Sequence, residues 1–433
     1  MRSIPIQPLT ASPHPSPRDR LHSPSRWQWS WLLASPHRLG FFAGALMLSV
    51  SALWWLLVLA ARWGHAPALP WALSPSLAHA LIMGFGFMPL FFTGFLFTAG
   101  PKWLGLPPVE ARSMLSPLLA SLSGWAVFLM GVHTLAPLAA IGLGAVAWGW
   151  TGFTWQFAGL VRASRVPDRT HARVVLGASI IGVASLWAAV AGLAMDEPGW
   201  SLAALGVGLW WFIAPVYAAV LHRMIPFFTA AALPVLDAWR PMWLLWTWLA
   251  ALGAQPLLGP WARVSDVGTA FAVGFNLCAA AGALWLAVRW GLVQSLRVRL
   301  LAMLHLGFVW LGIAFGLQAV AALVWWVSAR SVDLSLAPLH ALTLGFLGSI
   351  LLAMATRVSC GHGGRTLAAD NIAWGLFWGL QAAVVLRLLG ATHWTGSTGL
   401  VGLAAGLWAA VAVAWSLRYG RWYGRPRADG RPG

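Results

Sequence analysis

Charged residues are scarce in this sequence, and acidic residues are the scarcest. Only 9% of the 433 residues are charged, and Asp and Glu together number 10. Because a soluble domain carries about 25% charged residues, the composition excludes an ordinary water-soluble protein. The lack of carboxylates also argues against a proton-coupled carrier built on Asp and Glu relays. The two cysteines, Cys278 and Cys360, fall at different predicted depths and cannot form a disulfide framework.

Hydrophobic residues, in contrast, make up 60% of the chain. A helix that spans a bilayer needs about 20 mostly apolar residues. The chain contains twelve apolar runs of roughly this length, at about 39–63, 77–99, 114–135, 137–160, 173–194, 200–222, 242–258, 267–288, 300–327, 337–356, 371–391 and 398–417. The sequence therefore predicts an all-α, polytopic membrane protein with about 12 transmembrane helices.

Three regions follow from this pattern. Residues 1–36 are rich in Pro, Ser, Arg and His and have no apolar period, so we expect a disordered cytoplasmic tail. The transmembrane domain should occupy 37–418, and 419–433 should form a basic cytoplasmic tail. The formal net charge is +17, but the basic residues stand singly between apolar runs and form no patch. The lipid bilayer is therefore the expected partner, and nucleic acid is not.

The distribution of basic residues predicts the orientation, because Lys and Arg resist translocation. With the N-terminus in the cytoplasm, 23 of the 27 Lys and Arg fall on the cytoplasmic side. Arg62, Arg263 and Arg330 fall on the other side, and Arg387 lies within a predicted helix. Adding or removing one helix would destroy this division, so we expect twelve helices with both termini cytoplasmic.

Two predicted helices begin with the same motif. His79 and His340 each open a His-Ala-Leu-x-x-Gly-Phe sequence, about one turn inside the outer side. Two neutral imidazoles that face each other at one depth are what six-coordinate haem iron requires. The alternative is two histidines bonded to backbone carbonyls or water at helix starts. Small residues that would let helices, or a flat macrocycle, approach closely follow both histidines: Ala80, Gly84, Ala341 and Gly345.

Two arginines are candidates for the edge of such a haem. Arg387 lies about one turn below the outer end of the 371–391 run, and Arg62 lies at the outer end of the first run. Haem propionates that point outward could pair with either guanidinium group. Snorkelling to the interface is the alternative for Arg387.

Three further histidines lie toward the predicted cytoplasmic ends: His222, His305 and His362. With Cys360 and Met354 they offer soft and borderline ligands of the kind that suit copper. No pair has the spacing of helical metal ligands, however, and nearby arginines would repel a cation. Interfacial histidines that snorkel or cap a helix are therefore the alternative interpretation.

Several segments together resemble the NnrS family. They are GFLFTAGPKWLG at 94–105, RMIPFFTAAAL at 223–233, MLHLGFVWLG at 303–312 and LHALTLGFLGSILLAMATRVSCGHGGRTL at 339–367. The resemblance covers most of the chain from about residue 38. It implies a multi-pass protein of the bacterial inner membrane that binds haem and copper. It also implies an association with nitric oxide metabolism and with relief of nitrosative stress during denitrification.

The sequence departs from the family pattern at a few positions. Leu77 and Ala80 stand where the first histidine and the acid of a His-x-His-Glu pattern are usual, so only His79 remains. Lys102 replaces a usual Asn, and His222 stands where small residues are common. The loss of one histidine and the acid weakens the case for copper more than the case for haem.

A more distant likeness is to the catalytic subunit of haem–copper oxidases. That subunit has twelve helices in three four-helix arcs, and helices 2 and 10 hold a bis-histidine haem near the outer face. His79 and His340 occupy the matching helices, and the sixth predicted helix repeats the Ser-Leu-Ala opening of both, which suggests three arcs here too. The copper-site histidines of helices 6 and 7 are absent at mid-depth, so an oxygen-reducing centre is not supported.

These features together predict a haem protein of NnrS type that handles nitric oxide. The haem should be non-covalent and of b-type, because the chain has no Cys-x-x-Cys-His motif. Copper is a candidate second cofactor. The sequence does not identify an electron donor or decide between catalysis, sensing and protective binding. The rival class is a transporter of a metal or small neutral solute, since Pro89, Pro215 and Pro226 would suit broken transport helices.

Overall fold

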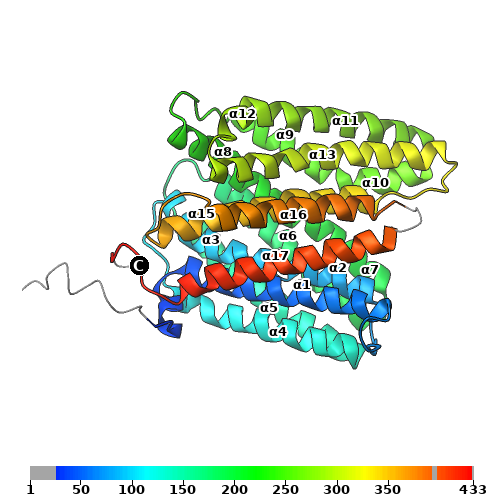
Figure 1. Ribbon diagram of the computed structural model, residues 1–433, viewed down its shortest axis with the longest axis horizontal. Coiled ribbons are helices and arrows are strands. Elements are labelled where there is room, and N and C mark those ends of the chain that lie inside the picture. Colours follow the sequence, from blue (N-terminus) through cyan, green and yellow to red (C-terminus); the bar gives the residue numbers. More distant parts are fainter. Residues whose placement is uncertain (1–25, 393–396, 432–433) are drawn as a thin grey trace, which may run out of the picture.

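The computed structural model describes residues 26–392 and 397–431, and every regular element within them is a helix. The helices lie side by side with roughly parallel axes and form one bundle (Figure 1). Eleven helical segments among the described residues are long and apolar enough to cross a membrane. The prediction of an all-α, polytopic membrane protein is therefore confirmed.

Some of these segments are single helices and others are composite. The single ones are α1 (Pro36–Arg62), α5 (Ala136–Ala163), α6 (Thr170–Ala194), α11 (Asp266–Arg289), α13 (Arg299–Val327), α16 (Asn371–Leu389) and α17 (Ser397–Tyr423). The composite ones are α2 (Pro75–Phe85) with α3 (Met88–Trp103), η2 (Ala111–Met114) with α4 (Leu115–His133), α7 (Pro198–Gly208) with η3 (Leu209–Ile213) and α8 (Ala214–Ala232), and α14 (Leu336–His340) with η4 (Ala341–Gly348) and α15 (Ser349–His362). The short α12 (Leu292–Ser295) lies in a connection.

The predicted helix at 242–258 differs from the structure. Two short helices, α9 (Met242–Gly253) and α10 (Gln255–Val264), occupy this region, and neither meets the length of a spanning helix. Pro256 lies in the first turn of α10 and has no N–H to bond the carbonyl of Leu252, so the α-helix is interrupted there.

The two ends of the described chain meet at one end of the bundle. The Gln28 N–H donates to the Gly424 carbonyl at 2.8 Å. The start of α1 and the end of α17 lie at the end of the bundle where the C-terminus is marked (Figure 1). A chain that returns to its starting side makes an even number of crossings. Eleven segments alone would be odd, so α9 and α10 together complete a twelfth crossing as one broken helix.

Both predicted tails are shorter in the structure than in the sequence interpretation. Residues 1–25 lie outside the described residues, but the rest of the predicted N-terminal tail is structured. The 3-10 helix η1 (Trp29–Ala34) precedes α1, and the indole N–H of Trp27 donates to the Gly420 carbonyl at 3.2 Å. At the other end, α17 extends to Tyr423, beyond the predicted boundary at 418. The segment before α1 and the end of α17 are therefore held together by the hydrogen bond between Trp27 and Gly420 and by aromatic packing.

Two of the composite crossings contain π-helical turns. In η3 the turn comes directly before Pro215, which cannot donate to the Trp211 carbonyl, so the wider turn accommodates the missing hydrogen bond. The second, η4, starts immediately after His340 and runs to Gly348. Since π-helical turns are rare and are frequent at functional sites, η4 draws attention to His340.

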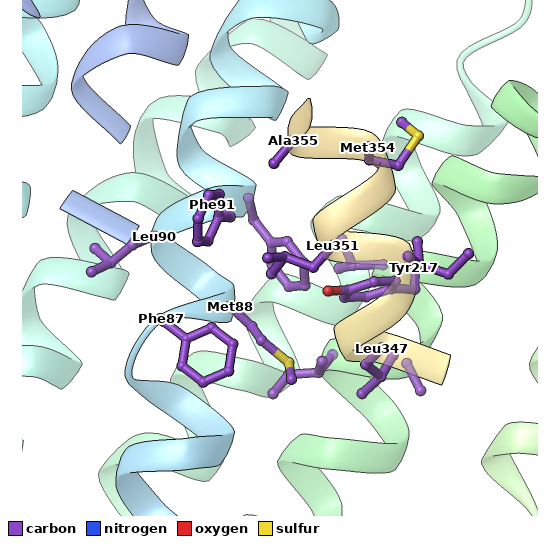
Figure 2. Packing of buried hydrophobic residues seen from close by; sticks show 14 of the residues in the cluster. Phe87, Met88, Leu90, Phe91, Tyr217, Leu347, Leu351, Met354 and Ala355 are labelled. Carbon is purple, nitrogen blue, oxygen red and sulfur yellow. The ribbon is translucent and has the colours of Figure 1, made fainter. Parts of the chain in front are cut away.

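Glycine allows α1 and α3 to approach each other closely. A Cβ atom at Gly40 would lie 2.4 Å from the Gly94 nitrogen, and one at Gly44 would lie 2.6 Å from the Phe91 ring. No side chain larger than hydrogen fits at Gly40 without moving the backbone of α3. This contact fixes α3. In Figure 2, Met88 and Phe91 of α3 lie among buried hydrophobic residues of α8 and α15. The start of α3 also lines the cavity described below.

Candidate functional site

A cavity lies at the end of the bundle opposite the two described termini. Its volume is about 100 Å³. His79 from α2, His340 from α14 and Arg387 from α16 all line it, although they are far apart in the sequence. We call it the histidine cavity. The structure thus brings together three residues that the sequence analysis singled out.

His79 lies in the first turns of α2 and has a buried ring nitrogen without a partner. Its Nδ1 atom makes no hydrogen bond to any described residue. The imidazole stacks on the indole of Trp55 from α1, with ring centroids 3.8 Å apart and planes 25° apart. An unpaired buried nitrogen costs free energy. Stacking therefore fixes the plane of the ring, and its Nδ1 atom has no partner among the described residues.

His340 ends α14 and has one ring nitrogen engaged. Its Nδ1–H donates to the Leu336 carbonyl at 2.7 Å, because a carbonyl oxygen can only accept. In the neutral ring this bond leaves the lone pair on Nε2. Metal-binding histidines usually have the same arrangement, in which a backbone carbonyl fixes the tautomer and the ring orientation.

Arg387 brings a positive charge to the same cavity. It is half-buried, lies within a spanning helix and makes no ion pair or hydrogen bond with any described residue. A cation within a membrane-spanning segment is costly and usually pairs with an anion or marks a binding site. An anionic group in the cavity would supply that missing partner.

The start of α16 is fixed by a separate acidic cap. The Asp370 carboxylate accepts from the Ala373 N–H at 3.0 Å and from the Arg418 guanidinium. Burial tends to raise the pKa of Asp370, but these hydrogen bonds outweigh it, so the pKa lies below its usual value. The ionised cap anchors the helix that carries Arg387 near its other end.

The remaining walls of the histidine cavity are mainly apolar. Met83, Phe87, Met88, Leu344 and Trp408 contribute to them. Two potential metal-ligand nitrogens, an unpaired cation and apolar walls fit a flat, largely apolar cofactor with an iron centre and anionic edge groups. The residues present therefore fit haem, and the orphaned Nδ1 atom of His79 is the observation that supports this fit most directly.

Not every residue named beside the two histidines lines the histidine cavity. Arg62 is exposed at the end of α1 and does not line the histidine cavity. A Cβ atom at Gly84 would lie 2.7 Å from Leu205, and one at Gly345 would lie 2.8 Å from Trp310. These glycines therefore allow neighbouring helices to approach and do not face the cavity.

The other predicted ligands, His222, His305 and His362, do not meet at one centre. Each lies beside a different partner, and no group of three or more His, Cys, Asp or Glu in the described parts of the chain could hold a metal ion. The Nε2–H of His222 donates to the Pro241 carbonyl at 3.1 Å, so its Nδ1 accepts from His171 at 3.0 Å. Both ring nitrogens of His222 are thus occupied.

His305 and His362 are separated from this pair. Nε2 of His305 is 2.9 Å from the Thr229 hydroxyl oxygen, and its buried Nδ1 has no described partner. The His362 ring packs on His37, with centroids 4.4 Å apart. His37 and His171 are both buried. The residues present do not fit a copper centre made from His222, His305 and His362.

The sequence analysis missed several residues of the histidine cavity. Trp55, for example, stacks directly on His79. Met83 follows His79 by four residues, so helical spacing alone would have placed both on one face. Thr343 and Trp408 also line the cavity. Nothing local marks Trp408, because its position depends on how α17 packs.

Comparison with protein families identifies the family of this chain. The family model described as NnrS protein matches residues 31–427, which is most of the chain. A search of curated proteins finds none that matches. The match includes the helices that carry His79, His340 and Arg387, and the chain belongs to the NnrS family.

Proposed function

We propose that this protein is an integral-membrane haem protein that handles nitric oxide, with one non-covalent b-type haem in the histidine cavity. The observation that carries the proposal is that His79, His340 and Arg387, from three separate helices, line a single cavity. Membership of the NnrS family, whose proteins the sequence analysis linked to haem and nitric oxide, supports it.

Each residue of the cavity has a distinct part in this proposal. His79 and His340 would hold the iron, with their rings oriented by Trp55 and by the Leu336 carbonyl respectively. Arg387 would hold the anionic edge of the cofactor, and the apolar walls would exclude water. Haem would supply an iron atom that exchanges one electron and that could bind nitric oxide after one of the two histidines leaves it.

The proposal also includes a cellular membrane and an orientation in it. The composition and eleven spanning segments favour a multi-pass membrane protein, and we place it in the bacterial inner membrane. The excess of basic residues at the end that carries the termini favours a cytoplasmic location for that end. The histidine cavity would then lie near the periplasmic side.

An absorption spectrum of the purified protein tests the proposal. We expect the full-length protein from haem-replete cells to be red, with a Soret band that sharpens on reduction by dithionite. His79→Ala and His340→Ala should each lose most of this band, because each removes one axial ligand. The exposed His65 lies at the same end of the bundle, so His65→Ala is the matched control and should keep the band.

Metal analysis completes the experiment. Iron should be present in about one equivalent per chain and should fall in both ligand variants. A colourless wild-type preparation without iron would overturn the proposal and favour a transporter. If only one of the two variants lost the band, the histidine replaced in the other variant would not be a ligand of the iron, and a different residue would have to bind there.

A further inference from the structure

A second cavity lies between α10, α11 and α13, near the end of the bundle opposite the described termini (Figure 1). Its volume is about 110 Å³. Each of the three helices contributes one carboxamide side chain to its wall: Gln255 at the start of α10, Asn276 in α11 and Gln318 in α13. The chain has nine Asn and Gln in all, so a third of them border one cavity. Because polar side chains within a membrane are costly and mark functional sites, we call this space the carboxamide cavity and ask what it binds.

The three carboxamides do not satisfy one another completely. The Gln255 Nε2 group donates to Asn276 Oδ1 and to the Ala251 carbonyl, both at 3.1 Å. Asn276 Nδ2 donates to the Ala272 carbonyl at 2.8 Å. The Oε1 atom of Gln255 and the whole amide of Gln318 make no hydrogen bond to any described residue, and neither is enclosed by protein atoms. Gln255 is only 7% exposed, so the cavity retains an open acceptor and an amide that can donate and accept.

The break between α9 and α10 brings Gln255 to this position. α9 ends at Gly253 and α10 begins at Gln255, directly before Pro256. Non-helical backbone at membrane depth is tolerated where it is buried in protein or lines a cavity. Broken helices also form ligand sites in many membrane proteins. The interruption of this crossing is therefore explained if the break borders a binding site.

The charged residues of the lining are paired with each other. Arg263 and Asp333 form an ion pair, with Nη2 and Oδ2 2.8 Å apart, and both side chains are about half exposed. The Arg263 guanidinium also lies over the Trp325 ring, 5.1 Å from its centroid. An anion in the cavity would meet the carboxylate, and a cation would meet the guanidinium. The lining therefore favours a neutral ligand that both donates and accepts hydrogen bonds.

A larger, apolar space adjoins the carboxamide cavity along the same helices. It lies between α9, α11 and α13, and its volume is about 330 Å³. On α13, Phe315 lines this space and Gln318 lines the cavity. At the α9–α10 break, Leu252 lines this space and Gln255 lines the cavity. Residues three apart on α13 share one face, so the two spaces are neighbours, about one helical turn apart. We call the larger space the apolar groove.

The apolar groove is open on one side and narrow. Trp243 and Trp285 line it and are 56% and 53% exposed, and both contact Trp239 at the end nearest the described termini. Small residues would let α9 and α11 approach closely, yet α9 packs on α8 and α11 packs on α13. An α-helix is about 10 Å across and rises about 5.4 Å per turn, so the groove holds less than one turn. It fits a single hydrocarbon chain and not a partner helix. The small residues that leave this gap are Ala250, Ala251, Ala279, Gly282 and Ala283.

We propose that the carboxamide cavity and the apolar groove together bind one neutral amphiphile from the bilayer. Its small hydrogen-bonding head group occupies the cavity, and its apolar chain occupies the groove. Isoprenoid quinones and neutral glycerides both have this chemistry. A phospholipid does not fit, because its phosphate group finds no cation in this lining apart from Arg263, which is paired. The site is made from other helices than the histidine cavity, so it does not depend on the proposed haem.

Native mass spectrometry of the full-length protein in detergent micelles tests the head-group site. Decylubiquinone and monoolein are the two probes, and we expect one saturable adduct per chain with at least one of them. Gln318→Leu removes the open amide at similar volume, so binding should weaken about three- to ten-fold with the lost hydrogen bonds. Gln156→Leu makes the same change on α5, away from both spaces, and should bind as the wild type does.

A second pair of variants tests the chain site. Ala279→Leu fills the apolar groove and should weaken binding at least about five-fold, because the chain can no longer pack there. Ala281 is exposed on the same helix and lines neither space, so Ala281→Leu is the matched control and should leave binding unchanged. The probe whose binding depends on both Gln318 and Ala279 identifies the source of the ligand as quinone or glyceride.

Every other outcome counts against the site. No saturable adduct with either probe overturns the inference, and so does an unchanged affinity in Gln318→Leu or in Ala279→Leu. Displacement of the probes by phosphatidylglycerol at lower concentration would also overturn it, because an anionic head group would then occupy the cavity. If Gln318→Leu fails to fold, Gln318→Met tests the same amide. No haem signal is measured, so a colourless protein that binds a probe in this way overturns the haem proposal alone.

Discussion

Arg387 is the one cation among the residues that line the histidine cavity, and its charge should affect the iron of the proposed haem. A nearby positive charge stabilises the reduced form, so Arg387→Leu should lower the haem midpoint potential. We expect a shift of about 30–60 mV, since 59 mV corresponds to about 1.4 kcal/mol for one electron. A redox titration followed by the Soret band measures this shift.

Arg387→Lys is the control for this prediction. It keeps the charge but loses the planar guanidinium group, so the potential should stay closer to that of the wild type than in Arg387→Leu. Equal potentials in the wild type and Arg387→Leu would contradict a role at the cofactor edge. Snorkelling to the interface would then be the better account of this residue.

At the residue scale, the sequence could predict the residues that carry a repeated signal. His79 and His340 share a motif and a depth, and Arg387 stands out as a cation within an apolar run. The pairs His171–His222 and His37–His362 have no such signal, because their partners come from different helices. The burial of His37 likewise has no local signal, because the helix that it begins packs against the C-terminal segment.

At the scale of the element, the close approach of α1 and α3 is a point at which the fold can be tested. Gly40→Ala would place a Cβ atom 2.4 Å from the Gly94 nitrogen, so the helices must separate. We expect a loss of about 1–3 kcal/mol in the free energy of unfolding, as in other overpacked interiors. Thermal or denaturant unfolding in detergent measures it.

Gly159 in α5 provides the comparison. A Cβ atom there would meet nothing within 4 Å, and the residue is exposed. Gly159→Ala should therefore leave stability unchanged or raise it by up to about 1 kcal/mol, because alanine favours the helix. Equal destabilisation by the two substitutions would mean that helix propensity, and not the α1–α3 contact, determines the effect.

Element boundaries were predictable where polarity changes and not where helical register changes. The apolar runs gave the spanning segments closely, since each has to cover the bilayer. The π-helical turns η3 and η4 were not predicted. A helix that is apolar on all sides lacks the alternation of polar and apolar residues that would reveal a change in helical register. Pro256, in contrast, was a visible cause of the break between α9 and α10.

At the scale of the whole molecule, the two described termini lie on the same side, which implies that α9 and α10 together cross the membrane. Cysteine labelling can test this crossing directly. Val235 and Val264 flank the broken helix and are 86% and 74% exposed. In a chain in which both native cysteines are replaced, Val264→Cys should react with a membrane-impermeant maleimide from the periplasm of intact cells. Val235→Cys should react only after the membrane is opened, because the positive-inside distribution puts it in the cytoplasm.

Each pattern of labelling has a separate meaning for the fold. If both cysteines react from one side, α9 and α10 do not cross, and the side-by-side termini must be explained differently. If the two sides are exchanged, the broken helix still crosses but the orientation is reversed. The histidine cavity would then open toward the cytoplasm, and its source of electrons and nitric oxide would have to lie there. The crossing depends on local packing around Pro256, whereas the orientation depends on charge summed over the entire chain, so the two properties can fail independently.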